Sequence, residues 1–141
     1  GGVERARSFA KRIEAPLAII DKRRDRPNQA TATHVIGDVD GKIAVLVDDI
    51  IDTAGTICAG AEVLLREGAR EVYACATHGV LSGKAIEIIE KSPIKEMVIL
   101  DTIKQTEEKK CDKIRVLPVA PVFTEAIARI YEEVSISPLF G

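Results

Sequence analysis

The sequence predicts an α/β fold in which a parallel sheet is covered by helices on both faces. Apolar runs without polar alternation, such as residues 43–47 (IAVLV), are typical of strands that are buried on both sides. Such runs alternate with helical patterns along most of the chain, as expected for a parallel sheet with crossover helices. The 141 residues suffice for one buried core, and no linker or low-complexity segment divides them. We therefore expect one three-layer domain over residues 1–141.

The first quarter of the chain is expected to hold a helix, a strand and a long loop. Apolar residues recur at helical spacing up to Ile13, and Pro16 blocks continuation, which predicts a helix over residues 4–14. Residues 17–20 (LAII) predict a buried strand that ends at Asp21. Residues 22–34 (KRRDRPNQATATH) have no hydrophobic face. They predict a long loop, with His34 as a loop residue, and a long loop in a compact domain is often functional.

The remaining chain repeats strand and helix. A short strand at 35–36 and a turn at Asp40-Gly41 precede the strand at 43–47, and Gly68 ends the next helix. The other expected strands are 72–76, 97–100 and 114–117, and the expected helices are 56–66, 84–90 and 123–133. In the last helix Phe123, Ala126, Ile127, Ile130 and Tyr131 are expected to face the core.

Composition excludes several classes of function. The 20 basic and 22 acidic residues leave no positive excess for a nucleic-acid backbone, and 4% aromatic residues provide no platform for stacked bases. No apolar run reaches the roughly 18 residues that cross a bilayer. Three widely spaced cysteines form neither a CxxC pair nor a disulfide framework, which favours reduced thiols in the cytoplasm.

Residues 43–56 (IAVLVDDIIDTAGT) carry the clearest chemical signal. A buried strand is expected to end in Asp48 and Asp49, before a short turn and a helix, and this is where open α/β sheets bind ligands. Small residues, threonine hydroxyls and a helix N-terminus attract an anion. Carboxylates repel phosphate but accept hydrogen bonds from sugar hydroxyls or hold a hydrated cation. Each feature alone is an ordinary strand end or helix cap. Together they predict a site for a phosphorylated sugar.

The string DDIIDTAGT resembles the PRPP-binding signature of type I phosphoribosyltransferases and PRPP synthetases. Four flanking segments resemble PRPP synthetases, also called ribose-phosphate pyrophosphokinases, in the expected order: APLAIIDKRRDRPN, VIGDVDGK, EVYACATHGVLSG and SISPLF. The resemblance covers essentially the whole chain. It implies a type I phosphoribosyltransferase-like fold and an enzyme of nucleotide biosynthesis in which ribose 5-phosphate attacks the β-phosphorus of Mg-ATP, giving PRPP and AMP.

The resemblance also assigns roles to residues of this sequence. Asp52, Thr53, Ala54, Gly55 and Thr56 would cradle the 5-phosphate, and Asp48, with Asp49 nearby, would bind the ribose hydroxyls. Lys22 and Arg24 match the catalytic loop of the family, and Arg24 is also expected to contact the substrate. Two cations in a loop suit a reaction that depends on positioning and charge stabilisation. Without the resemblance, KRRDR would be an ordinary solvated charge run.

The same resemblance implies that the chain corresponds to the C-terminal half of a two-domain enzyme. The N-terminal half would supply most ATP contacts and most ligands of Mg²⁺, and the full-length protein would be a homo-oligomer. His34 and His78 do not match the metal ligand of the family, and we expect no metal site within the chain. Ser135 and Ser137 lie in a tail whose counterpart helps to form an allosteric anion site, although a plain polar tail explains them equally well.

Two alternatives remain open at this point. A phosphoribosyltransferase would share the signature, but no nucleobase pocket or pyrophosphate loop is located in the sequence. A non-catalytic PRPP synthetase-associated regulatory subunit would keep the fold while losing catalytic positions. The presence of Lys22, Arg24 and residues 48–56 argues against the second alternative.

Overall fold

The computed structural model describes residues 2–23 and 32–140 of the chain. The elements follow one another as α1 (Gly2–Arg12), β1 (Ile19–Arg23), β2 (Ala32–Ile36), β3 (Ile43–Ile51), α2 (Gly55–Arg66), β4 (Glu71–Gly79), α3 (Ala85–Lys91), β5 (Ile94–Leu100), the 3-10 turn η1 (Glu107–Lys109), β6 (Ile114–Leu117), α4 (Ala120–Tyr131) and the 3-10 turn η2 (Ser137–Leu139). No helix of the described part is long and apolar enough to cross a membrane.

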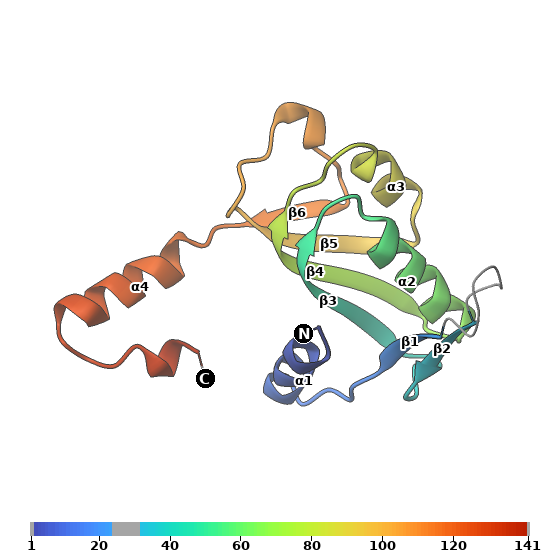
Figure 1. Cartoon of the computed structure of the whole chain (residues 1–141), viewed down its shortest axis with the longest axis horizontal. Coiled ribbons are helices and arrows are strands. Elements are labelled where there is room, and N and C mark those ends of the chain that lie inside the picture. The colour runs from blue at the N-terminus through green and yellow to red at the C-terminus, as the bar shows by residue number, and fades with distance from the viewer. Residues whose placement is uncertain (1, 24–31, 141) are drawn as a thin grey trace.

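The centre of the molecule is a four-stranded parallel sheet in the order β3-β4-β5-β6 (Figure 1). The carboxyl ends of all four strands therefore lie along the same side of the sheet. A separate antiparallel hairpin of β1 and β2 precedes the sheet, with Ile19 opposite Ile36. The predicted α/β fold with a helix-flanked parallel sheet is confirmed.

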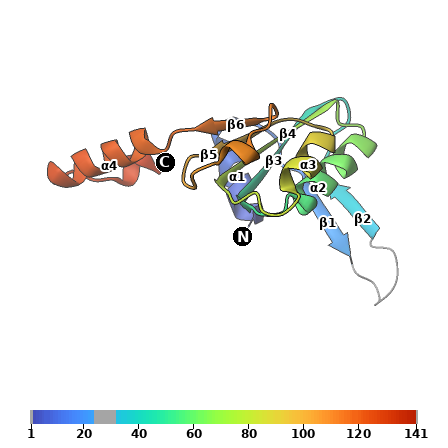
Figure 2. The same ribbon diagram turned by 90° about the horizontal axis from the view of Figure 1, so that it is seen from above.

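One face of the sheet is covered by α2 and α3 (Figure 2). Side chains alternate along β4, so Val72, Ala74 and Ala76 are buried on this face while their neighbours are half-exposed. They pack with apolar residues of the two helices, among them Leu64 and Ile89, in one continuous core. Burying this apolar face stabilises the sheet by roughly 25 cal/mol per Å² of apolar area removed from water.

The first helix, α1, flanks the opposite face at β3. Leu46 points toward α2, since a Cβ on Gly60 would lie 3.8 Å from its methyl groups. Asp49 has the opposite parity along the strand and forms an ion pair with Arg5 of α1. Helices therefore lie on both faces at β3. A mainly apolar cavity of about 650 Å³ is lined by residues of α1, β1, β3 and α2, among them Asp48 and Thr56 of the predicted site.

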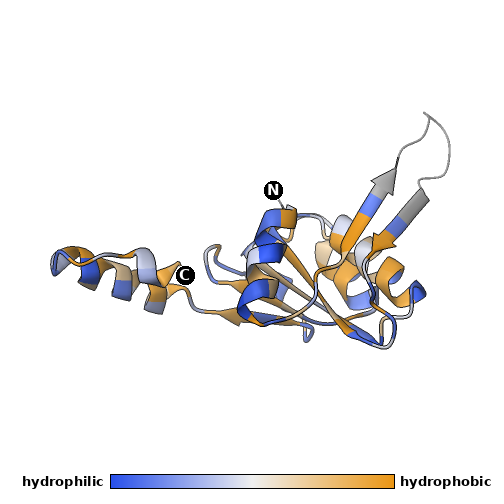
Figure 3. Ribbon diagram, turned by 90° about the horizontal axis from the view of Figure 1, so that it is seen from below, coloured by the Kyte–Doolittle hydropathy of each residue, from blue (hydrophilic) through white to orange (hydrophobic). Residues whose placement is uncertain are grey.

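The last helix does not cover the sheet, so the predicted core face of this helix is wrong. None of its residues is buried, and Phe123, Ile127 and Tyr131 are 59%, 65% and 89% exposed. Figure 3 shows α4, with its apolar stripe, on an arm that extends away from the sheet. The sequence pattern correctly predicted an amphipathic helix, but amphipathicity does not specify what packs against the apolar face.

Several predicted boundaries differ from the structure. β1 continues through Lys22, which pairs with Thr33, and His34 pairs with Asp21, so both lie in strands rather than in the predicted loop. Cross-strand hydrogen bonds hold these polar residues extended although they have no continuous apolar face. β3 also extends beyond its two aspartates, because Ile50 and Ile51 still pair with β4.

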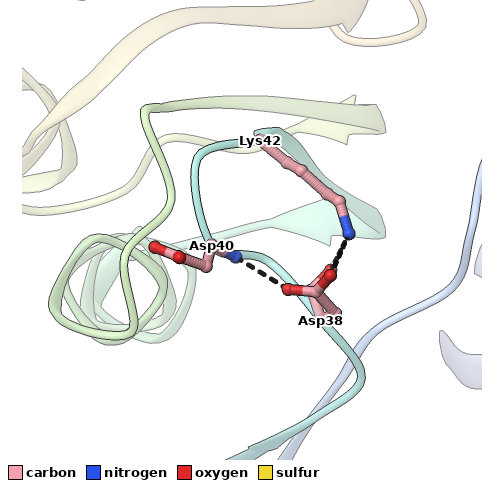
Figure 4. Close-up of polar contacts among 3 residues, drawn as sticks. All are labelled: Asp38, Asp40 and Lys42. Atoms are coloured by element: carbon pink, nitrogen blue, oxygen red, sulfur yellow. Dashed lines mark hydrogen bonds and ion pairs between the residues drawn. The ribbon is translucent and has the colours of Figure 1, made fainter.

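A polar turn fixes the start of β3. Asp38 accepts hydrogen bonds from the Asp40 N–H at 3.1 Å and from Lys42 Nζ at 2.5 Å (Figure 4). The Lys42 ammonium is the main reason that the pKa of Asp38 lies below its usual value. The left-handed backbone of Gly68 (φ +94°) favours glycine beside this turn, and a Cβ there would also displace the Asp40 side chain, whose Oδ1 would lie 2.3 Å away. The turn predicted at Asp40-Gly41 is confirmed.

Candidate functional site

The loop between β3 and α2 has the geometry of an anion cradle. Ala54 adopts the left-handed conformation (φ +63°), which is strained for a residue with a Cβ, and it is 4% exposed. The first backbone hydrogen bond of α2 runs from Cys58 N–H to Ala54 O at 3.1 Å. Within the described residues, the N–H groups of Gly55, Thr56 and Ile57 have no protein acceptor. These donors and the positive end of the helix dipole suit an anionic ligand.

Space lies in front of this loop at Gly55. The nearest atom that a Cβ there would meet is Thr53 Oγ1, at 3.9 Å, and the backbone φ is not positive. Packing and backbone conformation therefore do not require glycine. The missing side chain leaves room for a ligand to approach the backbone, as in other phosphate loops.

Two carboxylates lie just before the loop, on adjacent residues of β3. The Asp49 N–H donates to Asp48 Oδ1 at 2.8 Å, and Asp49 itself accepts from Arg5 at 3.0 Å. A hydrogen bond with the Asp48 side chain is the largest cause that holds the pKa of Asp49 below its usual value, and the Arg5 guanidinium adds to it. Asp48 is half-buried and Asp49 exposed. Of these two carboxylates, Asp48 is the one that forms no ion pair within the described part of the chain.

The next loop along the sheet edge supports the cradle. After β4, the N–H groups of Val80 and Leu81 donate to Ile51 O at 2.9 and 3.2 Å, and that of Ser82 donates to Asp52 O at 3.0 Å. The Ser82 hydroxyl also donates to Asp52 Oδ1 at 2.5 Å. Two backbone segments 30 residues apart are therefore joined at the carboxyl ends of β3 and β4.

A histidine near the end of β4 forms a further contact at the carboxyl ends of the strands. His78 Nδ1 lies 2.9 Å from Thr102 Oγ1, which itself lies 3.1 Å from the Thr77 carbonyl. Since the threonine hydroxyl has one proton and donates it to the carbonyl, it accepts from Nδ1–H. The hydrogen bonds thus join the ends of β4 and β5.

The structure unites some of the predicted site residues and separates others. Residues 48–56 form one continuous strand, loop and helix start. The Lys22 backbone lies in β1, and Arg24 lies outside the described residues. Ser135 and Ser137 lie after α4, where Ser135 Oγ accepts from the Ser137 N–H at 3.2 Å and Arg129 donates to the Ser135 carbonyl at 3.1 Å. They belong to the arm and not to the sheet edge.

Sequence reasoning missed two residues that contact the predicted site, Arg5 and Ser82. Nothing in the local pattern of α1 singles out Arg5. A signal for Ser82 did exist, because THGVLSG follows the strand after β3, and adjacent parallel strands place their following loops side by side.

A parallel sheet with a strand-loop-helix anion cradle and carboxylates at the carboxyl end of a strand is an arrangement typical of α/β domains that bind phosphorylated ligands. The family model of the phosphoribosyl synthetase-associated domain matches residues 23–141, and the chain belongs to this family.

Curated relatives match this chain over all or nearly all of its length. A ribose-phosphate pyrophosphokinase of Caldanaerobacter subterraneus subsp. tengcongensis is 64% identical over 140 residues, which are 99% of this chain and 44% of the relative. One from Bacillus cereus is 59% identical over 141 residues, 100% of this chain and 44% of the relative. The chain thus spans less than half the length of these relatives.

A solved structure supports the fold. The crystal structure of phosphoribosylpyrophosphate synthetase from Mycobacterium smegmatis superimposes with a TM-score of 0.83 at 36% identity, over 93% of this chain and 42% of that chain.

Proposed function

We propose that the chain is the ribose-5-phosphate-binding, C-terminal part of a ribose-phosphate pyrophosphokinase. The names of the relatives support the activity, and their greater length supports a part rather than the whole. In the proposed reaction the anomeric hydroxyl of ribose 5-phosphate attacks the β-phosphorus of ATP. A new oxygen–phosphorus bond forms, the bond from the β-phosphorus to the oxygen bridging to the α-phosphorus breaks, the hydroxyl proton is lost, and PRPP and AMP leave.

The proposal rests mainly on the backbone N–H groups between β3 and the first turn of α2 that have no acceptor within the described residues. Gly55, Thr56 and Ile57 each present a backbone donor without a protein acceptor in the described part of the chain, next to the open space at Gly55. The 5-phosphate would accept these hydrogen bonds together with those of the Thr53 and Thr56 hydroxyls. Binding the non-reacting phosphate in this way fixes the position of the sugar for attack.

The ribose hydroxyls are assigned to Asp48. Its carboxylate lies four residues before the loop on the same edge of the sheet, and Asp49 is engaged by Arg5. A carboxylate accepts hydrogen bonds from two adjacent hydroxyls. Asp49, through its backbone bond to Asp48, would keep that carboxylate oriented.

The catalytic role is assigned to Lys22 and Arg24. β1 ends at Arg23, so Arg24 follows directly after the strand that carries Lys22. Cations that approach the transferring group stabilise the charge that develops on its oxygens. Arg24 would in addition contact bound substrate.

Mg²⁺ belongs to the proposal because the substrate nucleotide carries it. The described residues contain no group of three or more His, Cys, Asp or Glu side chains suited to a metal, and Mg²⁺ usually needs only one or two carboxylates besides substrate phosphates and water. The remaining ligands and most ATP contacts are assigned to the N-terminal part of the longer protein. An allosteric anion site at Ser135 and Ser137, a homo-oligomer and a cytoplasmic location complete the proposal.

Titration calorimetry with ribose 5-phosphate tests the binding role, and AMP release from ATP by a full-length protein that contains this chain tests the activity. A regulatory subunit would bind the sugar phosphate without releasing AMP. A phosphoribosyltransferase would instead consume PRPP in the presence of a nucleobase.

A further inference from the structure

The loop after β4, residues 80–83, holds the phosphate-binding loop in shape. Three of its backbone N–H groups donate to Ile51 or Asp52, at 2.9–3.2 Å. Leu81 anchors it, since this side chain is 2% exposed and its backbone is left-handed (φ +51°). A non-glycine residue adopts such a conformation only where its surroundings determine it.

The side chain of Asp52 presents a chemical difficulty for a phosphate site. It begins the loop, and its negative charge repels the ligand. Aspartate at such a position also readily accepts hydrogen bonds from backbone N–H groups two or three residues further on, here Ala54 and Gly55. Those donors would then be occupied by the protein.

The structure shows the Asp52 carboxylate engaged elsewhere. Its Oδ1 accepts the Ser82 hydroxyl proton at 2.5 Å, and Ser82 is the hydrogen-bond donor that the described residues offer it. α2 has no side-chain cap at its N-terminus. The carboxylate is therefore held toward the β4–α3 loop and not toward the amides of its own loop.

We infer that Ser82 is a positioning residue for the phosphate-binding loop, holding the Asp52 carboxylate so that the N–H groups of residues 54–57 stay free for the phosphate of the ligand. The inference rests on the proposed function for the identity of the ligand. Ser82 acts through Asp52 and contacts no reacting atom.

A double-mutant cycle measured by calorimetry with ribose 5-phosphate tests this role. Ser82→Ala is expected to weaken binding about 10-fold, and Ser82→Thr, which keeps the hydroxyl, to restore it to within about threefold. In an Asp52→Ala background, Ser82→Ala is expected to change affinity less than about twofold, because the carboxylate that Ser82 holds is gone. Ser8→Ala, an exposed hydroxyl deletion on α1, is the matched control.

A second measurement needs no ligand. In Ser82→Ala the released Asp52 carboxylate is expected to accept the Ala54 or Gly55 N–H, and amide temperature coefficients from NMR would become smaller at that residue. Unchanged coefficients, or Ser82 and Asp52 effects that simply add, would overturn the inference. Absence of ribose 5-phosphate binding by the wild-type chain would instead contradict the proposed function, while the amide measurement would still decide the role of Ser82.

Discussion

The Arg5 guanidinium lies 3.0 Å from the Asp49 carboxylate, so an ion pair joins the first helix to the strand that carries the site acids. Both side chains are partly exposed, at 38% and 54%, and water screens the attraction. The pair therefore serves mainly to orient Asp49, which its neighbour Asp48 also constrains.

The lowered pKa of Asp49 predicts a specific dependence of stability on pH. A carboxyl whose pKa is lower in the folded state stabilises the fold above its unfolded pKa of about 3.9, and this contribution is lost as pH falls through the folded value. In urea unfolding between pH 7 and pH 2.5, the stability difference between wild type and Asp49→Asn should vanish at the acid end. In an Arg5→Gln variant, part of the pH-dependent stabilisation by Asp49 should remain, because the hydrogen bond with Asp48 is the larger cause of its lowered pKa. A difference independent of pH would contradict the assignment.

Replacing Gly55 with valine is expected to weaken ribose 5-phosphate binding at least about 10-fold, or about 1.4 kcal/mol. The added side chain fills the space in front of the loop, while the backbone there accepts a Cβ without strain. Calorimetry on the folded variant measures the loss. Ala128→Val, on the exposed side of α4, adds similar bulk far from the loop and should bind like wild type. Unchanged affinity in Gly55→Val would remove the loop from the site.

In a full-length pyrophosphokinase that contains this chain, Lys22→Ala is expected to lower kcat by roughly 10³–10⁵-fold with little change in KM. This split follows if Lys22 stabilises charge only during transfer. Steady-state kinetics measure both constants. Lys95→Ala removes an exposed lysine from β5 and should leave kcat within about twofold. A near-wild-type kcat in Lys22→Ala would contradict a catalytic role for Lys22.

The 141-residue chain alone is expected to release no AMP from ATP and ribose 5-phosphate at a useful rate. Pyrophosphoryl transfer needs the ATP contacts and metal ligands that the proposal assigns to the rest of the longer protein. A coupled AMP assay with and without magnesium checks this. Robust magnesium-dependent turnover would show that the chain is catalytically complete.

The exposed position of α4 predicts a contrast between two isoleucines. Ile89, at 0% exposure in the core, should cost about 2–5 kcal/mol of unfolding free energy when changed to alanine. Ile127, at 65% exposure, should cost less than about 0.5 kcal/mol in the same substitution. Chemical denaturation of both variants measures the difference. Comparable losses would mean that α4 packs against the domain in solution.

Local pattern predicted the sheet and the strand-loop-helix geometry of residues 48–56 well, because the apolar run before Asp48 and the small residues after Ile51 are contiguous in sequence. It failed where a distant partner decides the outcome. Lys22 is extended because Thr33 pairs with it, and β3 continues past Asp49 because β4 lies beside it. The Ser82–Asp52 bond spans 30 residues, and only the adjacency of two parallel strands predicts it. The apolar stripe of α4 shows that periodicity defines a face but not its partner.

The terminal place of β3 in the sheet has a consequence for handling the protein. The sheet of the described residues has β4 on one side of this nine-residue strand and no partner on the other, and Ile43, Val45 and Ile50 on it are about half-exposed. Unpaired backbone donors and acceptors beside exposed apolar side chains offer a template on which another chain adds as a strand. Aggregation at high concentration is therefore expected to begin here, and a lysine in place of Val45 would be the first substitution to suppress it.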